Sequence, residues 1–169
     1  FRGTQMGGTE HRRPRLPPLL LTGASGFVGT RLAAALSARG DSVRVSRLRL
    51  GGSDPTDWST ELDGCRAVVH LAARVHVMRE TAADPLQSFR AVNTAGTLEL
   101  ARQAATAGVR RFVFVSSIKV NGEGTEPGRP FRHDDVPRPL DPYGVSKAEA
   151  EAGLREIGAT TGMQVAIVR

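Results

Sequence analysis

The chain has 169 residues, of which 40% are hydrophobic and 24% charged, which is typical of one globular domain. Its formal net charge is +6, but the arginines are scattered apart from a small cluster at Arg12, Arg13 and Arg15, and the chain has only one Tyr and one Trp. We therefore expect no nucleic-acid partner, because an aromatic stacking platform is missing. No apolar run reaches the roughly 18 residues of a membrane span, so we expect no membrane partner and a cytoplasmic location.

The predicted elements alternate between strands and helices along the chain. Residues 1–15 are polar, glycine-rich and basic, and we expect a disordered extension or a vector-derived segment outside the fold. In residues 16–169 we expect strands at about 18–22, from Ser42, and at about 67–72, 111–116 and 164–169, with helices at about 27–39, 85–107 and 143–160. The alternation predicts an α/β fold, a doubly wound parallel sheet.

A glycine-rich turn follows the first predicted strand. Gly23 permits a tight turn, Gly26 leaves room for a pyrophosphate to approach the backbone, and Gly29 lets the next helix pack closely on the strand. The helix N-terminus offers free N–H groups to phosphate. The alternative is an ordinary strand–turn–helix whose glycines serve geometry alone. We expect the whole turn to bind a dinucleotide, through Gly23, Ala24, Ser25, Gly26, Phe27, Val28 and Gly29.

Tyr143 and Lys147 lie four residues apart in the helix predicted at 143–160, so both side chains project from one face. A nearby ammonium favours the phenolate and lowers the pKa of a tyrosine from its usual value of about 10. We therefore expect the pair to donate and accept a proton near neutral pH. A serine pair, Ser116–Ser117, ends the apolar run before this helix.

Together, the G-x-x-G-x-x-G turn, the serine pair and the Y-x-x-x-K helix resemble the short-chain dehydrogenase/reductase superfamily. The details resemble its extended branch, the NAD-dependent epimerase/dehydratase family. Further segments that match are Val68–Ala73, Val92–Thr97, Phe112–Ser117 and Asp141–Tyr143. The narrower runs Ala73–Met78 and Ser116–Gly122 resemble a bacterial subgroup associated with surface-polysaccharide sugar nucleotides. Its members are described as UDP-glucose 4-epimerase-like or as reductases of UDP-4-keto-6-deoxy-hexosamines.

The resemblance implies a Rossmann fold and an enzyme that uses NAD or NADP at C4 of a UDP-hexose or UDP-hexosamine, as an epimerase or a 4-keto reductase. It assigns Tyr143 as proton shuttle and has Lys147 lower the tyrosine pKa and bind the nicotinamide ribose. Ser117 would hydrogen-bond the same substrate oxygen as Tyr143. The alternative gives that role to Ser116, with Ser117 only ending the strand. A non-catalytic NAD(P)-binding module, a sensor or partner-binding protein, is the alternative to an enzyme.

Other cofactor contacts are expected at the strand ends. The resemblance places Leu71, Ala72 and Ala73 beside the cofactor and includes Asn93, with a structural hydrogen-bonding role. No acid stands at the end of the second strand, where one would bind the ribose 2′-hydroxyl of NAD. Arg47 stands there and would pair with the 2′-phosphate of NADP. A solvated arginine beyond a frayed strand is an equal alternative.

The chain departs from the family pattern in two ways. It stops at the last predicted strand, so we expect an incomplete Rossmann fold without the C-terminal lobe that grips the sugar nucleotide. The segment between the second strand and residue 67 is short, so the family's third strand is vestigial or missing, and neither Asp54 nor Asp57 is expected to replace the missing acid. The helices at about 85–107 and 143–160 would form a four-helix bundle in a homodimer.

No metal site is expected. The single cysteine, Cys65, is interpreted as a small buried residue, and a lone cysteine gives no metal cluster. His70 lies inside an apolar strand and is interpreted as a core residue, whereas His76 and His133 have no matching ligands at metal-binding spacing.

Overall fold

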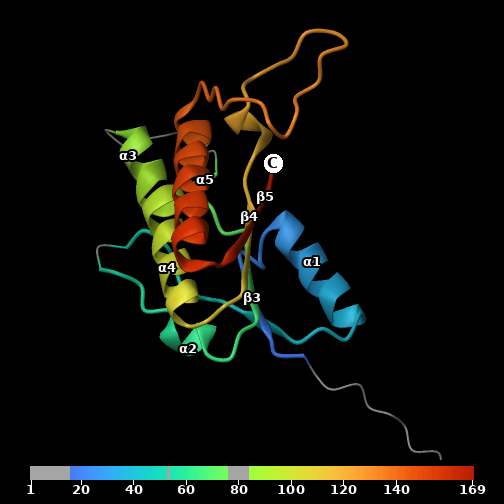
Figure 1. Ribbon diagram of the computed structural model, residues 1–169, viewed down its shortest axis with the longest axis vertical. Coiled ribbons are helices and arrows are strands. Elements are labelled where there is room, and N and C mark those ends of the chain that lie inside the picture. Colours follow the sequence, from blue (N-terminus) through green and yellow to red (C-terminus); the bar gives the residue numbers. More distant parts are fainter. Residues whose placement is uncertain (1–15, 53, 76–83) are drawn as a thin grey trace, which may run out of the picture.

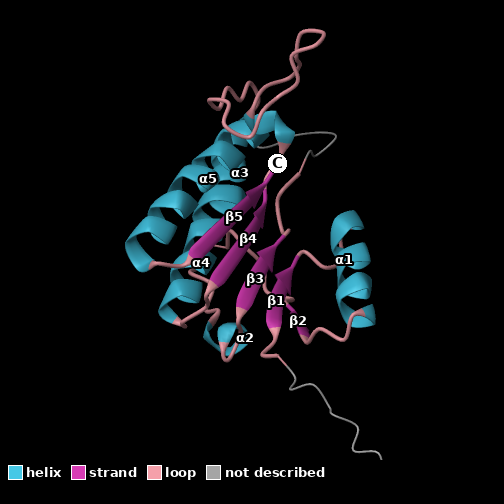
Figure 2. Cartoon of the chain, turned by 45° about the vertical axis from the view of Figure 1, so that its right-hand side comes forward, coloured by secondary structure: helices cyan, strands magenta, loops and turns pink. Residues whose placement is uncertain are grey.

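A single parallel sheet organises the chain, whose computed structural model describes residues 16–52, 54–75 and 84–169. The strand order is β2-β1-β3-β4-β5, and every neighbouring pair is parallel. Figure 2 shows all five strands pointing toward the same end of the molecule. The predicted parallel sheet is confirmed, with strands β1 (Leu19–Thr22), β2 (Val43–Val45), β3 (Ala67–His70), β4 (Arg111–Val115) and β5 (Gln164–Val168).

Helices lie on both faces of this sheet, as a doubly wound fold requires (Figures 1 and 2). The helix α1 (Phe27–Ala38) covers one face. The opposite face carries α3 (Pro85–Phe89), α4 (Thr97–Thr106) and α5 (Pro142–Thr161), which lie side by side. Residues 1–15 and His76 lie outside the described residues, so their interpretations stay predictions.

The core lies between the sheet and the α4–α5 layer. β1 is buried at all four positions, as a central strand covered on both faces should be. In β4 alternate side chains are buried, because successive residues of a strand point to opposite faces. Phe112 and Phe114 thereby pack with Leu100 of α4 and Leu154 of α5 in one apolar cluster.

The helix expected at 85–107 is confirmed in extent but not in regularity. A seven-residue π-helix, Arg90–Gly96, separates α3 from α4. Side chains from this segment bind the neighbouring elements: Asn93 hydrogen-bonds Arg74, and Thr94 Oγ1 donates to the carbonyl of Ser146 at 2.9 Å. The apolar spacing of the sequence gives no sign of the wider turn, because such a turn is maintained by contacts with other elements.

Between β2 and β3 the described residues contain no strand, which agrees with the expectation that the family's third strand is vestigial or missing. The one regular element there is the short helix α2 (Ser59–Leu62), which the sequence did not predict. Trp58 is fully buried, and its backbone N–H donates to Gln103 Oε1 of α4 at 2.8 Å. Gln103 Nε2 in turn donates to the carbonyl of Thr56 at 2.8 Å. This connection is therefore fixed to α4 instead of extending the sheet.

Candidate functional site

A cavity of about 890 Å³ opens at the carboxyl ends of the strands, where parallel α/β sheets bind their ligands. It brings together the glycine turn, the ends of β2, β3 and β4, and Tyr143 in the first turn of α5. Most of the predicted cofactor residues line it: Gly23, Ala24, Ser25, Gly26, Phe27, Val28, Gly29, Arg47, Leu71, Ala72, Ala73 and Tyr143. The sequence analysis missed other lining residues that also follow strand ends: Val45, Ser46, Leu48, Val75, Val115 and Ser116.

The glycine turn has the close contacts that its spacing predicts. Gly23 has φ +70°, and a Cβ atom there would lie 2.5 Å from the Ala72 backbone nitrogen. A Cβ on Gly29 would lie 2.1 Å from the Gly23 carbonyl oxygen, so only glycine lets α1 approach the turn. At Gly26 the nearest atom to such a Cβ is 3.4 Å away, so protein atoms leave that side open to a ligand.

The N-terminus of α1 is suited to a diphosphate. Its N-cap residue, Gly26, has no side chain to satisfy the free N–H groups of the first turn, and that turn holds no acidic residue. The helix dipole adds a partial positive charge at the same place. Phe27 is 89% exposed and Val28 54% exposed at the cavity wall. Among the described residues, the cradle therefore fits the pyrophosphate of a dinucleotide.

The end of β2 gives the cavity its charge. Arg47 is exposed and is the one charged side chain among the cavity-lining residues that the structure describes. Ser46 is held by its backbone N–H, which donates to the Leu21 carbonyl at 2.9 Å. Asp57 does not line the cavity; its carboxylate accepts the Ser59 N–H at 2.9 Å. The described wall thus presents a cation and no carboxylate where the adenosine ribose is expected.

Tyr143 stands at the start of α5, where local capping fixes it. Asp141 is the N-cap and its carboxylate accepts the N–H of Gly144, while Pro142 occupies the first turn. Lys119 Nζ pairs with Asp141 at 3.0 Å. The Tyr143 ring packs edge-on against Phe89, with 6.0 Å between the ring centroids. The helix start, and with it the phenol, is therefore tied to the segment that follows β4.

The expected lowering of the Tyr143 pKa by Lys147 is wrong for this geometry. Burial raises the pKa of Tyr143, although a hydrogen bond with Ser117 opposes the shift. The Lys147 ammonium is 1% exposed and donates to the Val115 carbonyl at 2.8 Å. It also lies 3.8 Å from the centroid of the Phe114 ring. The lysine is therefore engaged with β4 instead of the phenol.

Burial lowers the pKa of Lys147 to about 7, although the nearby Glu151 carboxylate acts in the opposite direction. The ammonium is consequently close to its titration point at neutral pH. Lys147 is not among the residues that line the cavity, and neither is Ser117. A contact of either residue with the cofactor or the substrate stays a prediction.

The two serines occupy different environments. Ser116 is 8% exposed, and its hydroxyl donates to Glu151 at 2.6 Å. Ser117 has extended backbone angles and accepts the Lys119 N–H at 3.2 Å, which caps the short 3₁₀ helix Ile118–Val120. Ser116 is thus occupied by a buried carboxylate, while the hydroxyl of Ser117 is available to Tyr143.

Asn93 and His70 are buried and hydrogen-bond residues of other elements. Asn93 is 1% exposed; its amide bonds both backbone groups of Arg74 and donates to Ser146 Oγ at 3.1 Å. It does not line the cavity, so its role is to fix the segment after β3 against α5.

His70 is fully buried between Thr22 Oγ1 at 2.6 Å and Thr97 Oγ1 at 2.9 Å. Burial lowers its pKa to about 3, so it is neutral, as the interpretation as a core histidine requires.

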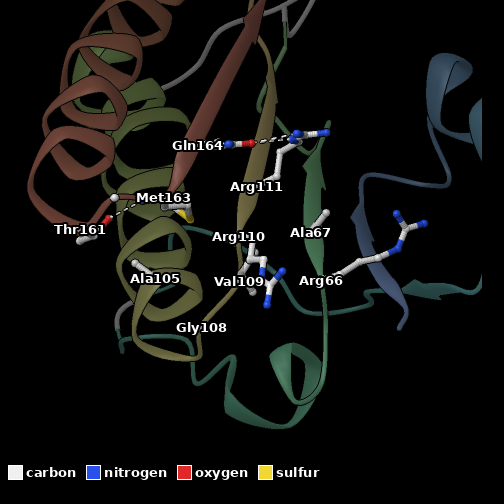
Figure 3. A pocket seen from close by; sticks show the side chains of 11 residues that line it. Arg66, Ala67, Ala105, Gly108, Val109, Arg110, Arg111, Thr161, Met163 and Gln164 are labelled. Carbon is white, nitrogen blue, oxygen red and sulfur yellow. Dashed lines mark hydrogen bonds between the residues drawn. The ribbon is translucent and has the colours of Figure 1, made fainter. Parts of the chain in front are cut away.

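A second cavity of about 690 Å³ lies at the opposite, amino ends of β3, β4 and β5 (Figure 3). Three arginines surround it: Arg66, Arg110 and Arg111. Arg66 pairs with Asp41 at 2.9 Å, and Arg111 binds Gln164 at 2.8 Å. None of the predicted site residues is found there, so it has no part in the expected chemistry.

The described residues contain neither a metal-binding cluster nor a membrane-spanning helix. No group of three or more His, Cys, Asp or Glu side chains is placed to hold a metal ion within those ranges. In the same part of the chain, no helix combines the length and apolar character that crossing a membrane requires.

The comparisons with known proteins agree with this geometry. A UDP-glucose 4-epimerase from Vibrio cholerae is 45% identical over 164 residues, which cover 89% of this chain and 50% of that protein. A GDP-6-deoxy-D-mannose reductase from Pseudomonas aeruginosa is 34% identical, with coverage of 89% and 50%. The solved structure of RMD from Pseudomonas aeruginosa complexed with NADPH has a TM-score of 0.75 and 32% identity, covering 90% of this chain and 53% of that one.

The chain spans about half the length of these curated relatives. The sequence model of one family, described as NAD dependent epimerase/dehydratase, matches residues 19–169, which are nearly all of the described fold. The chain therefore belongs to the NAD-dependent epimerase/dehydratase family and has the Rossmann fold of its NAD(P)-binding half.

Proposed function

We propose that the full-length protein is an NAD(P)-dependent epimerase or 4-keto reductase that acts at C4 of a UDP-hexose or UDP-hexosamine. The observation that carries the proposal is one cavity lined both by the phosphate-binding turn Gly23–Gly29 and by Tyr143. A dinucleotide held at the turn extends along the strand ends toward the phenol. Two relatives, which are named as an epimerase of UDP-glucose and a reductase of a GDP-sugar, support this class of substrate.

The chain's own residues would bind, orient and move a proton. The first turn of α1 holds the diphosphate, and the ends of β2 and β3 hold the adenosine side. When bound, the nicotinamide supplies hydride transfer. The Tyr143 hydroxyl exchanges a proton with the C4 oxygen of the hexose, and Ser117 hydrogen-bonds the same oxygen. Lys147 Nζ donates to the Val115 carbonyl and so holds α5 against the end of β4 beside this part of the site.

The Tyr143 pKa, raised by burial, suits the protonated phenol as a donor at neutral pH. Proton donation is the direction that a reductase needs, and proton uptake begins an epimerase cycle. Because the same residues serve both directions, the choice between them depends on cofactor consumption. An epimerase leaves the nicotinamide absorbance unchanged over many turnovers, whereas a reductase consumes one NAD(P)H for each sugar converted.

The substitution Tyr143→Phe in the full-length protein tests the enzyme proposal. It removes only the hydroxyl, so turnover should fall by about 10²-fold or more while the melting temperature and dinucleotide binding stay near wild type. Binding of the dinucleotide by the same variant serves as the control. If the variant keeps normal activity, Tyr143 is not the proton shuttle and the proposal fails.

A second candidate is a non-catalytic NAD(P)-binding module that acts as a sensor or binds a partner. The observation that favours it is that Ser117 and Lys147 do not line the cavity. Under this proposal, Tyr143→Phe leaves every biological readout of the full-length protein unchanged. A full-length wild-type protein that binds NAD(P)H and converts no UDP-hexose would select this candidate.

Three further parts of the proposal concern the setting of the enzyme. We infer a homodimer, in which α4 and α5 pair with the same helices of a second copy. Their placement as one layer on the outside of the sheet supports this, and light scattering tests it. A role in surface-polysaccharide biosynthesis is proposed from the subgroup resemblance of residues 73–78 and 116–122. A cytoplasmic location is proposed from the composition of the chain.

A further inference from the structure

A buried ion pair lies behind the predicted catalytic residues and is used by none of the roles above. Glu151 of α5 is 1% exposed, and its carboxylate accepts three hydrogen bonds from Nε and Nη2 of Arg169, the shortest at 2.6 Å. The same carboxylate accepts the Ser116 hydroxyl at 2.6 Å. Arg169 NH1 also donates to Asn121 at 3.2 Å. One carboxylate therefore joins α5 to the residues that directly follow β4 and β5.

The carboxylate is charged despite its burial. Burial raises the pKa of Glu151, but the hydrogen bonds from Arg169 and Ser116, with a smaller one from the half-exposed Arg155, more than offset it and lower the pKa overall. Removing one partner from a buried ion pair leaves an uncompensated charge, so substitutions at this pair should destabilise the fold.

Helical spacing places this pair in register with the predicted site. Tyr143, Lys147 and Glu151 follow one another at intervals of four on one face of α5. Each meets a different residue of one tripeptide at the end of β4. Lys147 binds the Val115 carbonyl, Glu151 binds the Ser116 hydroxyl, and Tyr143 is hydrogen-bonded to Ser117.

We infer that the Glu151–Arg169 pair is a positioning clamp, which holds Ser116 against α5 and thereby presents Ser117 to Tyr143. Ser116 and Ser117 are adjacent in the chain, so fixing the side chain of Ser116 on Glu151 limits the positions that the Ser117 hydroxyl can take relative to Tyr143. The Ser116 N–H, which donates to the Val168 carbonyl at 2.6 Å, holds the backbone of this turn from the β5 side. The effect of the clamp on catalysis rests on the proposed function. Its effect on the position of Ser117 does not depend on that function.

The chain offers a direct optical readout, because Tyr143 is its only tyrosine. Tyrosinate absorbance as a function of pH therefore reports the Tyr143 pKa alone. The hydrogen bond from Ser117 stabilises the phenolate, so losing that bond should raise the pKa. The Asp141 carboxylate, which pairs with Lys119, also raises the Tyr143 pKa, and neither residue is altered by the substitutions below.

The experiment compares three variants of this chain. Ser116→Ala keeps the ion pair but cuts its link to β4, and Glu151→Gln removes the buried charge; both should raise the Tyr143 pKa by about half a unit or more. Arg155→Ala is the matched control, because it removes the exposed partner of the same carboxylate, and it should leave the Tyr143 pKa unchanged. Circular dichroism along each titration verifies that the fold persists.

In the full-length enzyme Ser116→Ala and Glu151→Gln should lower kcat by about 10- to 100-fold, whereas the control Arg155→Ala should leave kcat near wild type. The clamp is wrong if Ser116→Ala leaves both the Tyr143 pKa and kcat unchanged, even where Glu151→Gln lowers the melting temperature. Should Glu151→Gln fail to fold, Ser116→Ala alone decides. A wild-type enzyme without turnover would overturn the proposed function, while the tyrosinate titration would still test the clamp.

Discussion

At the residue scale, the side chains predicted to take part in catalysis contact different groups. Tyr143 lines the cavity as expected, but Lys147 is directed at the Val115 carbonyl, and Ser116 is taken up by Glu151. Helical spacing alone shows that Tyr143 and Lys147 share a face. It does not show which backbone or carboxylate groups a neighbouring strand brings to that face, so the Glu151–Arg169 pair had no signal in either local segment.

We expect Arg47 to influence the choice between NAD and NADP. This arginine is the charged group of the described cavity wall, so we expect the protein to bind NADP(H) more tightly than NAD(H). Arg47→Glu should reverse the order, because a carboxylate accepts the ribose 2′-hydroxyl of NAD and repels the 2′-phosphate. Calorimetric titration with both cofactors measures the ratio.

The exposed Arg49 is the matched control for Arg47, since it lies two residues away and does not line the cavity. Arg49→Glu makes the same change in net charge and should leave the preference in place. If wild type and Arg47→Glu have the same ratio of NAD(H) to NADP(H) dissociation constants, the arginine is solvated and takes no part in choosing the cofactor.

At the scale of the element, the parallel strands and the long helices followed from apolar patterning and turn residues, and all five expected strands are present. Three features did not follow. The π-helix Arg90–Gly96 depends on contacts of Asn93 and Thr94 with other elements. The helix α2 and the missing third strand depend on the burial of Trp58 against α4. Such tertiary contacts leave no periodic trace in a single sequence.

The glycine turn gives a prediction that separates stability from binding. Gly29→Ala places a Cβ 2.1 Å from the Gly23 oxygen, so overpacking should destabilise the fold by about 1–3 kcal/mol or more. Gly26→Ala meets its first protein atom at 3.4 Å, so stability should change little while dinucleotide binding is lost. Thermal unfolding and titration of both variants test this. A Gly26→Ala protein that binds NAD(P) normally would contradict the assignment of the turn.

The buried His70 joins β1, β3 and α4 through its two threonine contacts, and its titration should be visible in stability. Its pKa is lowered to about 3 in the fold, so the unfolded chain binds the extra proton at higher pH. Stability should therefore be full above about pH 6.5 and fall by up to about 1.4 kcal/mol per pH unit as the pH drops toward 3.

Carboxylates titrate in the same acidic range, so the His70→Gln variant is needed for comparison. Glutamine keeps a donor and an acceptor but takes up no proton. The variant should lose less stability between pH 6.5 and 4 than the wild type, as measured by denaturant unfolding. Parallel pH curves for the two proteins would show that His70 does not contribute to the acid response.

At the scale of the whole molecule, the expected site lies at the carboxyl ends of the strands, and the cavity at the amino ends of β3, β4 and β5 is lined by none of its residues (Figure 3). The chain matches about half of each curated relative, and this half contains the dinucleotide cavity with Tyr143 at its wall. We therefore expect this chain to bind a dinucleotide, and we expect its proposed sugar specificity to be measurable only in the full-length protein.

The most direct measurement is a titration of this chain with NAD⁺, NADH, NADP⁺ and NADPH, followed by thermal unfolding. The account predicts saturable binding of at least one redox pair and stabilisation by about 2.7 kcal/mol at a ligand concentration of about 100 times Kd. Gly26→Ala should abolish the shift. No shift with any of the four dinucleotides, from a protein that unfolds cooperatively, would contradict the assignment of the cavity between the glycine turn and Tyr143.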